Sequence, residues 1–110
     1  MRIRIFDSAK LDLLDGFLFY EAQAIGVGHY FLDSLYSDID SLTLYAGIHP
    51  KKLGSFHWML SKRFPYAVYY SVADNLVSVH AILDCRQDPK RIEERLVQER
   101  TRRWLQNGSG

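Results

Sequence analysis

Three side chains in the second half of the sequence are of types that could together perform acid–base chemistry. Tyr69 ends the unusual run RFPYAVY (63–69), His80 lies in VSVHAIL, and Arg86 follows a few residues later. A histidine titrates near neutral pH, a phenol can exchange a proton with it, and a guanidinium stabilises negative charge that develops in a reaction. The alternative is a polar cross-strand pair on a half-exposed sheet, or a contact surface for a partner. We favour this alternative.

Tyr69 and His80 can meet only if their segments pair as a β-hairpin. Ala73-Asp74-Asn75-Leu76 is the clearest turn in the chain, because Asp and Asn tolerate the positive φ of a two-residue type I′ turn. This register predicts one apolar face toward a core and one mixed face left open to a partner. The apolar face would hold the pairs Tyr66–Leu83, Val68–Ala81, Tyr70–Val79 and Val72–Val77, and the mixed face the pairs Tyr69–His80 and Ser71–Ser78.

The segments around this hairpin predict a further strand and a loop. Pro65 suits the first position of its strand, since proline cannot donate to the ladder. FHWML (56–60) predicts the preceding strand, with His57 able to join the mixed face. The glycine- and proline-containing stretch 46–55 predicts a loop.

The N-terminal half predicts a strand and two helices. RIRIF alternates charged and apolar residues, so Ile3 and Ile5 should face a core. A helix with Ser8 as its N-cap should follow and close at Gly26, where the missing Cβ permits a positive φ. Two apolar stripes predict an antiparallel helical hairpin. The first stripe is Leu11, Leu14, Leu18, Ala22 and Ile25, and the second is Phe31, Leu35, Ile39 and Leu42.

The chain is predicted to end in a helix that starts at Asp88, as N-cap, and Pro89. Ile92, Leu96 and Trp104 would supply its apolar stripe, and residues 106–110 would form a flexible tail. We therefore predict a single α+β domain over residues 1–110: an N-terminal strand, a helical hairpin, a three-stranded antiparallel meander and a C-terminal helix.

Composition narrows the class of protein. The chain has 110 residues, of which 47% are hydrophobic and 25% charged, as in an average globular domain. No apolar run approaches the roughly 20 residues of a membrane span, and MRIRIF is too short for a secretory signal. Cys85 is the one cysteine, which leaves no intrachain disulfide and no metal cluster. We expect a cytoplasmic protein with no membrane contact, metal or cofactor.

Charge is unevenly distributed along the chain. Residues 1–50 carry three Lys or Arg against seven Asp or Glu, whereas residues 51–110 carry eleven against six. Such a split predicts a basic face that could bind an acidic partner or nucleic acid. The alternative, that the two halves neutralise each other in the fold, stays open at this point.

Three stretches carry a resemblance to a known family. They are DLLDGFLFYEAQAIGVGHYFLDSL, RFPYAVYYSV and VHAILDCRQDPKRIEERL. In this order they resemble the aromatic–glutamate helix with its glycine turn, the Phe-Pro-Tyr strand, and the closing strand of the RelE/ParE superfamily of bacterial type II toxins. The glycine turn and Phe-Pro-Tyr favour the ParE branch. The resemblance spans residues 3–96 and implies a cytoplasmic toxin neutralised by a cognate antitoxin.

The resemblance implies one of two activities. ParE-type members are associated with inhibition of DNA gyrase and need no catalytic residues, whereas RelE-type members cut mRNA on the ribosome. RNA cleavage needs a base, an acid and a cation. The positions aligned with the catalytic lysines, arginine and tyrosine of RelE are Trp58, Leu60, Ala67 and Ile92. Of the RelE active-site residues, the arginine after the last strand is retained, as Arg86. Asp84 and Gln87 replace the histidine and the second arginine beside it, so RNA cleavage by the RelE mechanism is disfavoured.

We therefore expect a toxin that acts by binding, with an antitoxin laid against its sheet and helical hairpin. The residues expected to bind the target or the antitoxin are Lys62, Arg63, Tyr69, His80 and Arg86, the last three being the weak catalytic candidates. An exposed patch awaiting a partner is expected among Phe17, Phe19, Tyr20, Tyr30, Tyr36 and Tyr45. The alternatives are a ribosome-dependent mRNA endonuclease with an altered active site and a non-toxic remnant that still binds antitoxin.

Overall fold

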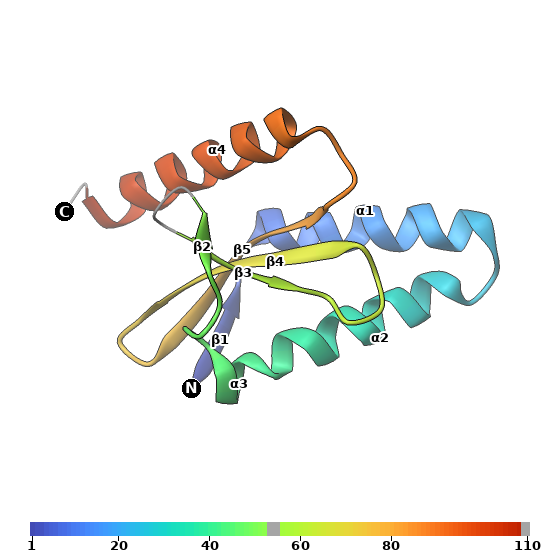
Figure 1. Ribbon diagram of the computed structural model, residues 1–110, viewed down its shortest axis with the longest axis horizontal. Helices are drawn as coiled ribbons and strands as arrows, with labels where there is room; N and C mark the ends of the chain where they lie inside the picture. The colour runs from blue at the N-terminus through green and yellow to red at the C-terminus, as the bar shows by residue number, and fades with distance from the viewer. Residues whose placement is uncertain (53–55, 109–110) are drawn as a thin grey trace.

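One sheet carries a helical hairpin on one face and the C-terminal helix on the other (Figure 1). The computed structural model describes residues 1–52 and 56–108. Its elements are β1 (Arg2–Ile5), α1 (Asp7–Gln23), α2 (Val27–Asp40), α3 (Leu42–Tyr45), β2 (Lys51–Lys52), β3 (Phe56–Leu60), β4 (Tyr66–Ala73), β5 (Leu76–Asp84) and α4 (Pro89–Gly108). The predicted α+β class is confirmed.

The sheet has the strand order β1-β5-β4-β3-β2. β2, β3, β4 and β5 form an antiparallel series, and β1 runs parallel to β5. The predicted antiparallel meander is confirmed in β3, β4 and β5, and the predicted N-terminal strand joins it in parallel. The loop predicted over 46–55 contains β2. Leu53, Gly54 and Ser55, from the same predicted loop, lie outside the described residues.

Helix α1 buries a different face from the one that its large apolar residues predict. The predicted stripe is exposed: Leu11 is 60%, Leu14 49%, Leu18 56% and Ile25 97% exposed. The buried residues of α1 are Ala9, Leu13 and Gly16. The cause is steric, because the Phe31 ring occupies the space where a Cβ on Gly16 would lie. Helix α1 approaches α2 closely at Gly16, and Leu11, Leu14 and Leu18 lie on the outer surface.

The second predicted stripe is confirmed. Phe31, Leu35 and Ile39 of α2 and Leu42 of α3 are buried against the apolar face of β4 and β5. Gly26 has φ 91°, as predicted, and separates the two helices. The N-cap of α1 is Phe6, not Ser8 as predicted. The Ser8 hydroxyl instead donates to the His80 carbonyl at 3.3 Å.

The β4–β5 hairpin follows the predicted register only near its turn. Asp74 and Asn75 have φ 51° and 62°, and the pairs from Val72–Val77 to Tyr70–Val79 form as expected. A β-bulge then leaves His80 without a partner, so that Tyr69 pairs with Ala81. The predicted pairs Tyr69–His80, Val68–Ala81 and Tyr66–Leu83 are wrong for this reason. The observed pairs are Val68–Ile82, Ala67–Leu83 and Tyr66–Asp84.

Side chains of α1 occupy the edge of β5 at the bulge. β1 ends at Ile5, opposite Val79, so β5 continues beyond its parallel neighbour. There Ser8 binds the His80 carbonyl, and an Asp12 carboxylate oxygen accepts the Ile82 N–H at 2.9 Å. Backbone groups that are buried require such partners. Side chains of α1 thus bind the backbone groups that the bulge leaves free, and the local sequence of β5 does not reveal these partners.

Helix α4 covers the sheet face that was expected to be open. Ile92 and Leu96 pack on Tyr69, Ala81 and Leu83. The cap predicted at Asp88 is confirmed, since its carboxylate accepts the Lys90 N–H at 2.9 Å. Trp104 is 66% exposed and does not continue the stripe. The helix runs to Gly108, into the segment where a tail was expected; residues 109–110 lie outside the described part.

Candidate functional site

The structure brings three of the five predicted site residues to one end of the sheet. Lys62 and Arg63 lie exposed in the β3–β4 turn, and Arg86 lies in the β5–α4 connection. These two connections are joined by a hydrogen bond from the Cys85 N–H to the Pro65 carbonyl at 2.7 Å. A basic end of the sheet therefore exists.

Tyr69 and His80 do not belong to this surface. Each is only 2% exposed, and both lie in the interior of the molecule. The expectation that they face outward as a pair is wrong, because the bulge separates them and α4 covers Tyr69. His57 also lies elsewhere: its ring stacks on Tyr70, on the opposite face of the sheet from Tyr69.

The buried imidazole of His80 is held in its neutral form. Its Nε2 shares a hydrogen bond of 2.8 Å with the Ser71 hydroxyl, and its ring lies between Phe6 and Phe56, each 4.8 Å from it between centroids. Burial lowers the pKa of His80 to about 4, and burial raises the pKa of Tyr69 to about 12. Neither group is suited to exchange protons with a substrate near neutral pH.

Burial of His80 makes folding stability depend on pH. The unfolded chain binds a proton at His80 below its ordinary pKa of 6.5, whereas the folded chain resists until about 4. Unfolding is therefore favoured as pH falls through this window, by about 3 kcal/mol in total. We expect urea unfolding to show this loss between about pH 7 and 4. In His80→Gln the pH dependence should be much weaker; an unchanged slope would contradict the assignment.

Arg86 is exposed but already paired. Its guanidinium forms a two-point contact with Asp84, at 2.8 and 3.0 Å, and approaches the Tyr20 hydroxyl at 3.5 Å. Hydrogen bonds from Arg86 lower the pKa of Asp84, and the same bonds raise the pKa of Arg86. The side chain of Arg86 is 58% exposed, so it remains accessible to a partner that can compete with Asp84.

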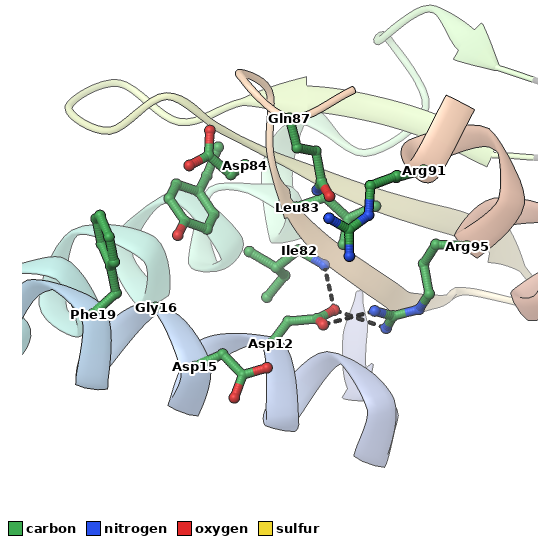
Figure 2. Close-up of a pocket in the computed structure, with 11 residues that line it drawn as sticks. Asp12, Asp15, Gly16, Phe19, Ile82, Leu83, Asp84, Gln87, Arg91 and Arg95 are labelled. Carbon is green, nitrogen blue, oxygen red and sulfur yellow. Dashed lines mark hydrogen bonds and ion pairs between the residues drawn. The ribbon is translucent and has the colours of Figure 1, made fainter. Parts of the chain in front are cut away.

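A cleft of about 420 Å³ opens beside this pair, between α1, the end of β5 and the start of α4 (Figure 2). It is lined by Asp12, Asp15, Gly16, Phe19, Tyr66, Ile82, Leu83, Asp84, Gln87, Arg91 and Arg95. Asp12 and Arg95 face each other across it and are bonded, as Figure 2 shows. Burial raises the pKa of the Tyr66 phenol to about 12. Of the carboxylates that line the cleft, Asp12 and Asp84 are paired with Arg95 and Arg86, whereas Asp15 is exposed.

A charge network with a buried centre links α1 to α4 beside the cleft. Arg95 donates to both oxygens of Asp12, at 2.7 and 2.8 Å, and to Glu99 at 2.6 Å. Glu99 is 2% exposed and also accepts from Arg102 and the Ser8 hydroxyl. Burial raises the pKa of Asp12, against the lowering effect of its hydrogen bonds. The network joins α4 to α1.

Sequence reasoning missed this network, although a signal exists. Ser8 and Asp12 are four residues apart on α1, as are Arg95 and Glu99 on α4. Residues at this spacing share one face of a helix. Two such polar faces could have indicated two helices in contact.

The outer face of the helical hairpin is an apolar surface. A groove of about 310 Å³ is lined by Lys10, Leu13, Leu14, Phe17, His29, Leu32 and Tyr36. Of the aromatic residues expected to form a patch, Phe19, Tyr30, Tyr36 and Tyr45 are 44–53% exposed, but Phe19 lines the cleft, Tyr36 this groove and Tyr45 a further pocket. Exposed carboxylates on the hairpin are Asp7, Asp15, Asp33 and Asp40. An exposed apolar surface of this kind marks an interaction site.

No group of three or more His, Cys, Asp or Glu side chains in residues 1–52 and 56–108 could hold a metal ion. Over the same part of the chain, no helix is long and apolar enough to cross a membrane.

Comparison with known proteins supports the fold. No protein-family model matches the chain, and no curated protein sequence matches it. A solved structure described as "Chromosomal ParDE TA system from P. aeruginosa" is similar, with a TM-score of 0.69 and 14% identity, over 74% of this chain and 92% of that chain. At this identity the similarity establishes a shared fold. The fold predicted from the RelE/ParE resemblance is thereby confirmed.

Proposed function

We propose that the chain is the toxin component of a type II toxin–antitoxin module and that it acts in the cytoplasm by binding its target. The fold shared with a chain of a ParDE system supports the module. The sequence motifs place the chain nearer the ParE branch, for which DNA gyrase is the proposed target. A fold shared at low identity does not carry an activity, so the mode of action needs its own support.

Binding rather than RNA cleavage is supported by what occupies the sheet under α4. The positions aligned with catalytic residues of RelE include Ala67 and Ile92, which are 0% and 7% exposed and pack together. Trp58 packs against the same apolar cluster. An apolar, covered surface has no base or acid to offer a phosphodiester. This is the observation that carries the proposal.

The antitoxin is proposed to bind the outer face of the helical hairpin. The sheet face that was first expected to receive it is occupied by α4. The hairpin instead offers the exposed leucines of α1 and the groove between α1 and α2. The apolar face of an amphipathic helix would match this apolar groove.

Expression of the chain alone in bacteria tests the proposal. We expect growth to stop, DNA supercoiling to be lost, and transcripts to stay intact. Co-expression of the gene neighbouring the toxin should restore growth if it encodes the antitoxin. Cleaved transcripts with halted translation would instead favour the ribosome-dependent endonuclease, and growth without inhibition would favour the non-toxic remnant.

Arg86 is expected to contribute to target binding. Arg86→Ala should raise the inducer level needed to stop growth by about tenfold, because exposed arginines often dominate interfaces. Its stability should change by less than about 1 kcal/mol, since the Asp84 pair is at the surface. Lys90→Ala removes a nearby exposed cation and serves as the control. Equal toxicity of the Arg86→Ala and control variants would remove Arg86 from the binding surface.

A further inference from the structure

The cleft beside Arg86 has two walls of opposite charge. Residues three or four apart share one face of a helix, so Asp12 and Asp15 line the cleft together from α1. Arg91 and Arg95 line it from α4, on the other side (Figure 2). Asp12 and Arg95 are bonded to each other, at 2.7 and 2.8 Å. Asp15 and Arg91 are exposed and form no ion pair within the described residues, so both remain accessible to a ligand.

The α1 wall is suited to an ammonium group with an apolar neighbour. Phe19 is 50% exposed and lies one helical turn after Asp15. The face of an aromatic ring attracts a cation, so a cation bound to Asp15 can gain a second contact from Phe19. Tyr66, Ile82 and Leu83 bring apolar surface of the sheet to the same cleft, each being 1–7% exposed.

The opposite wall is suited to a carboxylate. Arg91 lies in the first turn of α4, where the backbone N–H groups carry partial positive charge. Gln87 lines the cleft just before this helix. Both side chains can donate to carboxylate oxygens, and the guanidinium can do so through two N–H groups at once. Asp84, the carboxylate nearest to them in sequence, is already engaged by Arg86 at 2.8 and 3.0 Å.

Neither a simple anion nor a simple cation suits the whole cleft. Phosphate would be repelled by the aspartates of the lining, and a lone cation by Arg91. A ligand that carries both charges satisfies both walls. A free amino acid holds its two charges on one carbon, whereas each residue of an extended peptide adds about 3.3–3.6 Å between its ends. Because Asp15 and Arg91 are not within ion-pair distance of each other, a dipeptide bridges them better than a single amino acid does.

We infer that this cleft binds a dipeptide that has free termini and an apolar side chain. The ammonium group contacts Asp15 and Phe19, and the carboxylate contacts Arg91. The apolar side chain packs on Leu83. A volume of about 420 Å³ lies in the range of small-ligand sites. The cleft shares no lining residue with the groove on the helical hairpin, and the inference does not require the chain to be a toxin.

A chemical-shift titration of the isotope-labelled full chain with alanyl-leucine tests the inference. We expect a Kd on the order of 1 mM, with shift changes at Asp15, Phe19 and Arg91. Acetylation of the dipeptide removes its positive charge, and amidation removes its negative charge. Each modification should weaken binding by about tenfold, because one wall then loses its charged partner.

Two variants of the chain assign the two ends of the ligand. Asp15→Asn should weaken binding of alanyl-leucine by about tenfold but should not weaken binding of the acetylated form any further. Arg91→Gln should behave in the same way toward the amidated form. Asp33→Asn and Lys90→Gln make the same charge changes at exposed positions outside the cleft and should bind as the wild type does.

Four results would overturn the inference. They are no shift changes at about 20 mM dipeptide, equal binding of the free and blocked dipeptides, shift changes confined to residues outside the cleft, and tighter binding of inorganic phosphate at the same residues. The last result would assign the cleft to anions. The ligand comparisons use the wild-type chain, so they decide the matter even if a variant fails to fold.

Discussion

Replacing Asp12 with alanine is expected to lower the free energy of unfolding by about 3 kcal/mol. Asp12 is 10% exposed and accepts three hydrogen bonds, two from Arg95 and one from the Ile82 N–H. Its loss leaves the partly buried Arg95 guanidinium with Glu99 as its only carboxylate partner, beside the Ser8 carbonyl, and leaves the Ile82 N–H without its acceptor. The midpoint of thermal unfolding should fall by roughly 4–8 °C per kcal/mol in a domain of this size.

A double variant separates the effect of the orphaned charge from the loss of Asp12 itself. Burial raises the pKa of Asp12, so the ionised pair is not intrinsically favourable in this position. Asp12→Ala combined with Arg95→Met should therefore be more stable than Asp12→Ala alone, because no unpaired cation remains at that site. Asp12→Asn keeps an acceptor for Ile82 and should fall between wild type and alanine. Simple additivity of the two substitutions would contradict the network.

The parts of the fold that the sequence predicts are those set by neighbouring residues. Asp74 and Asn75 form the expected turn, since their positive φ values depend on local side-chain chemistry. The bulge at His80 is stabilised instead by Ser8 and Asp12, which lie 72 and 70 positions before the residues they bond, His80 and Ile82. No pattern within β4 or β5 contains that information. The outward placement of His80 was wrong for this reason.

The buried face of α1 was misjudged because hydrophobicity and helix packing favoured different residues. Leu11, Leu14 and Leu18 form the more apolar stripe, yet they face outward. Packing is governed by Gly16, which lets the Phe31 ring reach the helix backbone. An exposed leucine face on a small domain is also what an interaction surface requires. The failed prediction and the proposed antitoxin surface therefore have the same physical origin.

The candidate site was predictable only where its residues adjoin strand ends. Lys62 and Arg63 precede β4 and Arg86 follows β5, so antiparallel pairing of these strands places them together. The Asp12–Arg95 contact links helices at opposite ends of the sequence and depends on where α4 lies. Helix α4 in turn covers the face on which Tyr69 was expected to be accessible.

Replacing Gly28 with alanine is expected to destabilise the helical hairpin by about 2–3 kcal/mol. A Cβ at this position would lie 2.7 Å from the Phe17 carbonyl oxygen and 2.8 Å from the Glu21 Cβ. The first contact is with backbone, so no rotamer change relieves it and α2 must move away from α1. Denaturant unfolding followed by circular dichroism measures the loss as a lower midpoint with an unchanged slope.

Gly26, two residues before Gly28, provides a matched control with a different physical role. A Cβ on Gly26 would meet nothing within 4 Å, but its φ of 91° is unfavourable for other residues. Gly26→Ala should therefore cost only about 1 kcal/mol, and Gly26→Asn less. The backbone N–H groups of Gly26 and Gly28 both donate to the Glu21 carboxylate, at 2.9–3.1 Å. Glu21 of α1 therefore fixes the turn and the start of α2. If Gly28→Ala is no more destabilising than Gly26→Ala, close helix approach is not what requires the second glycine.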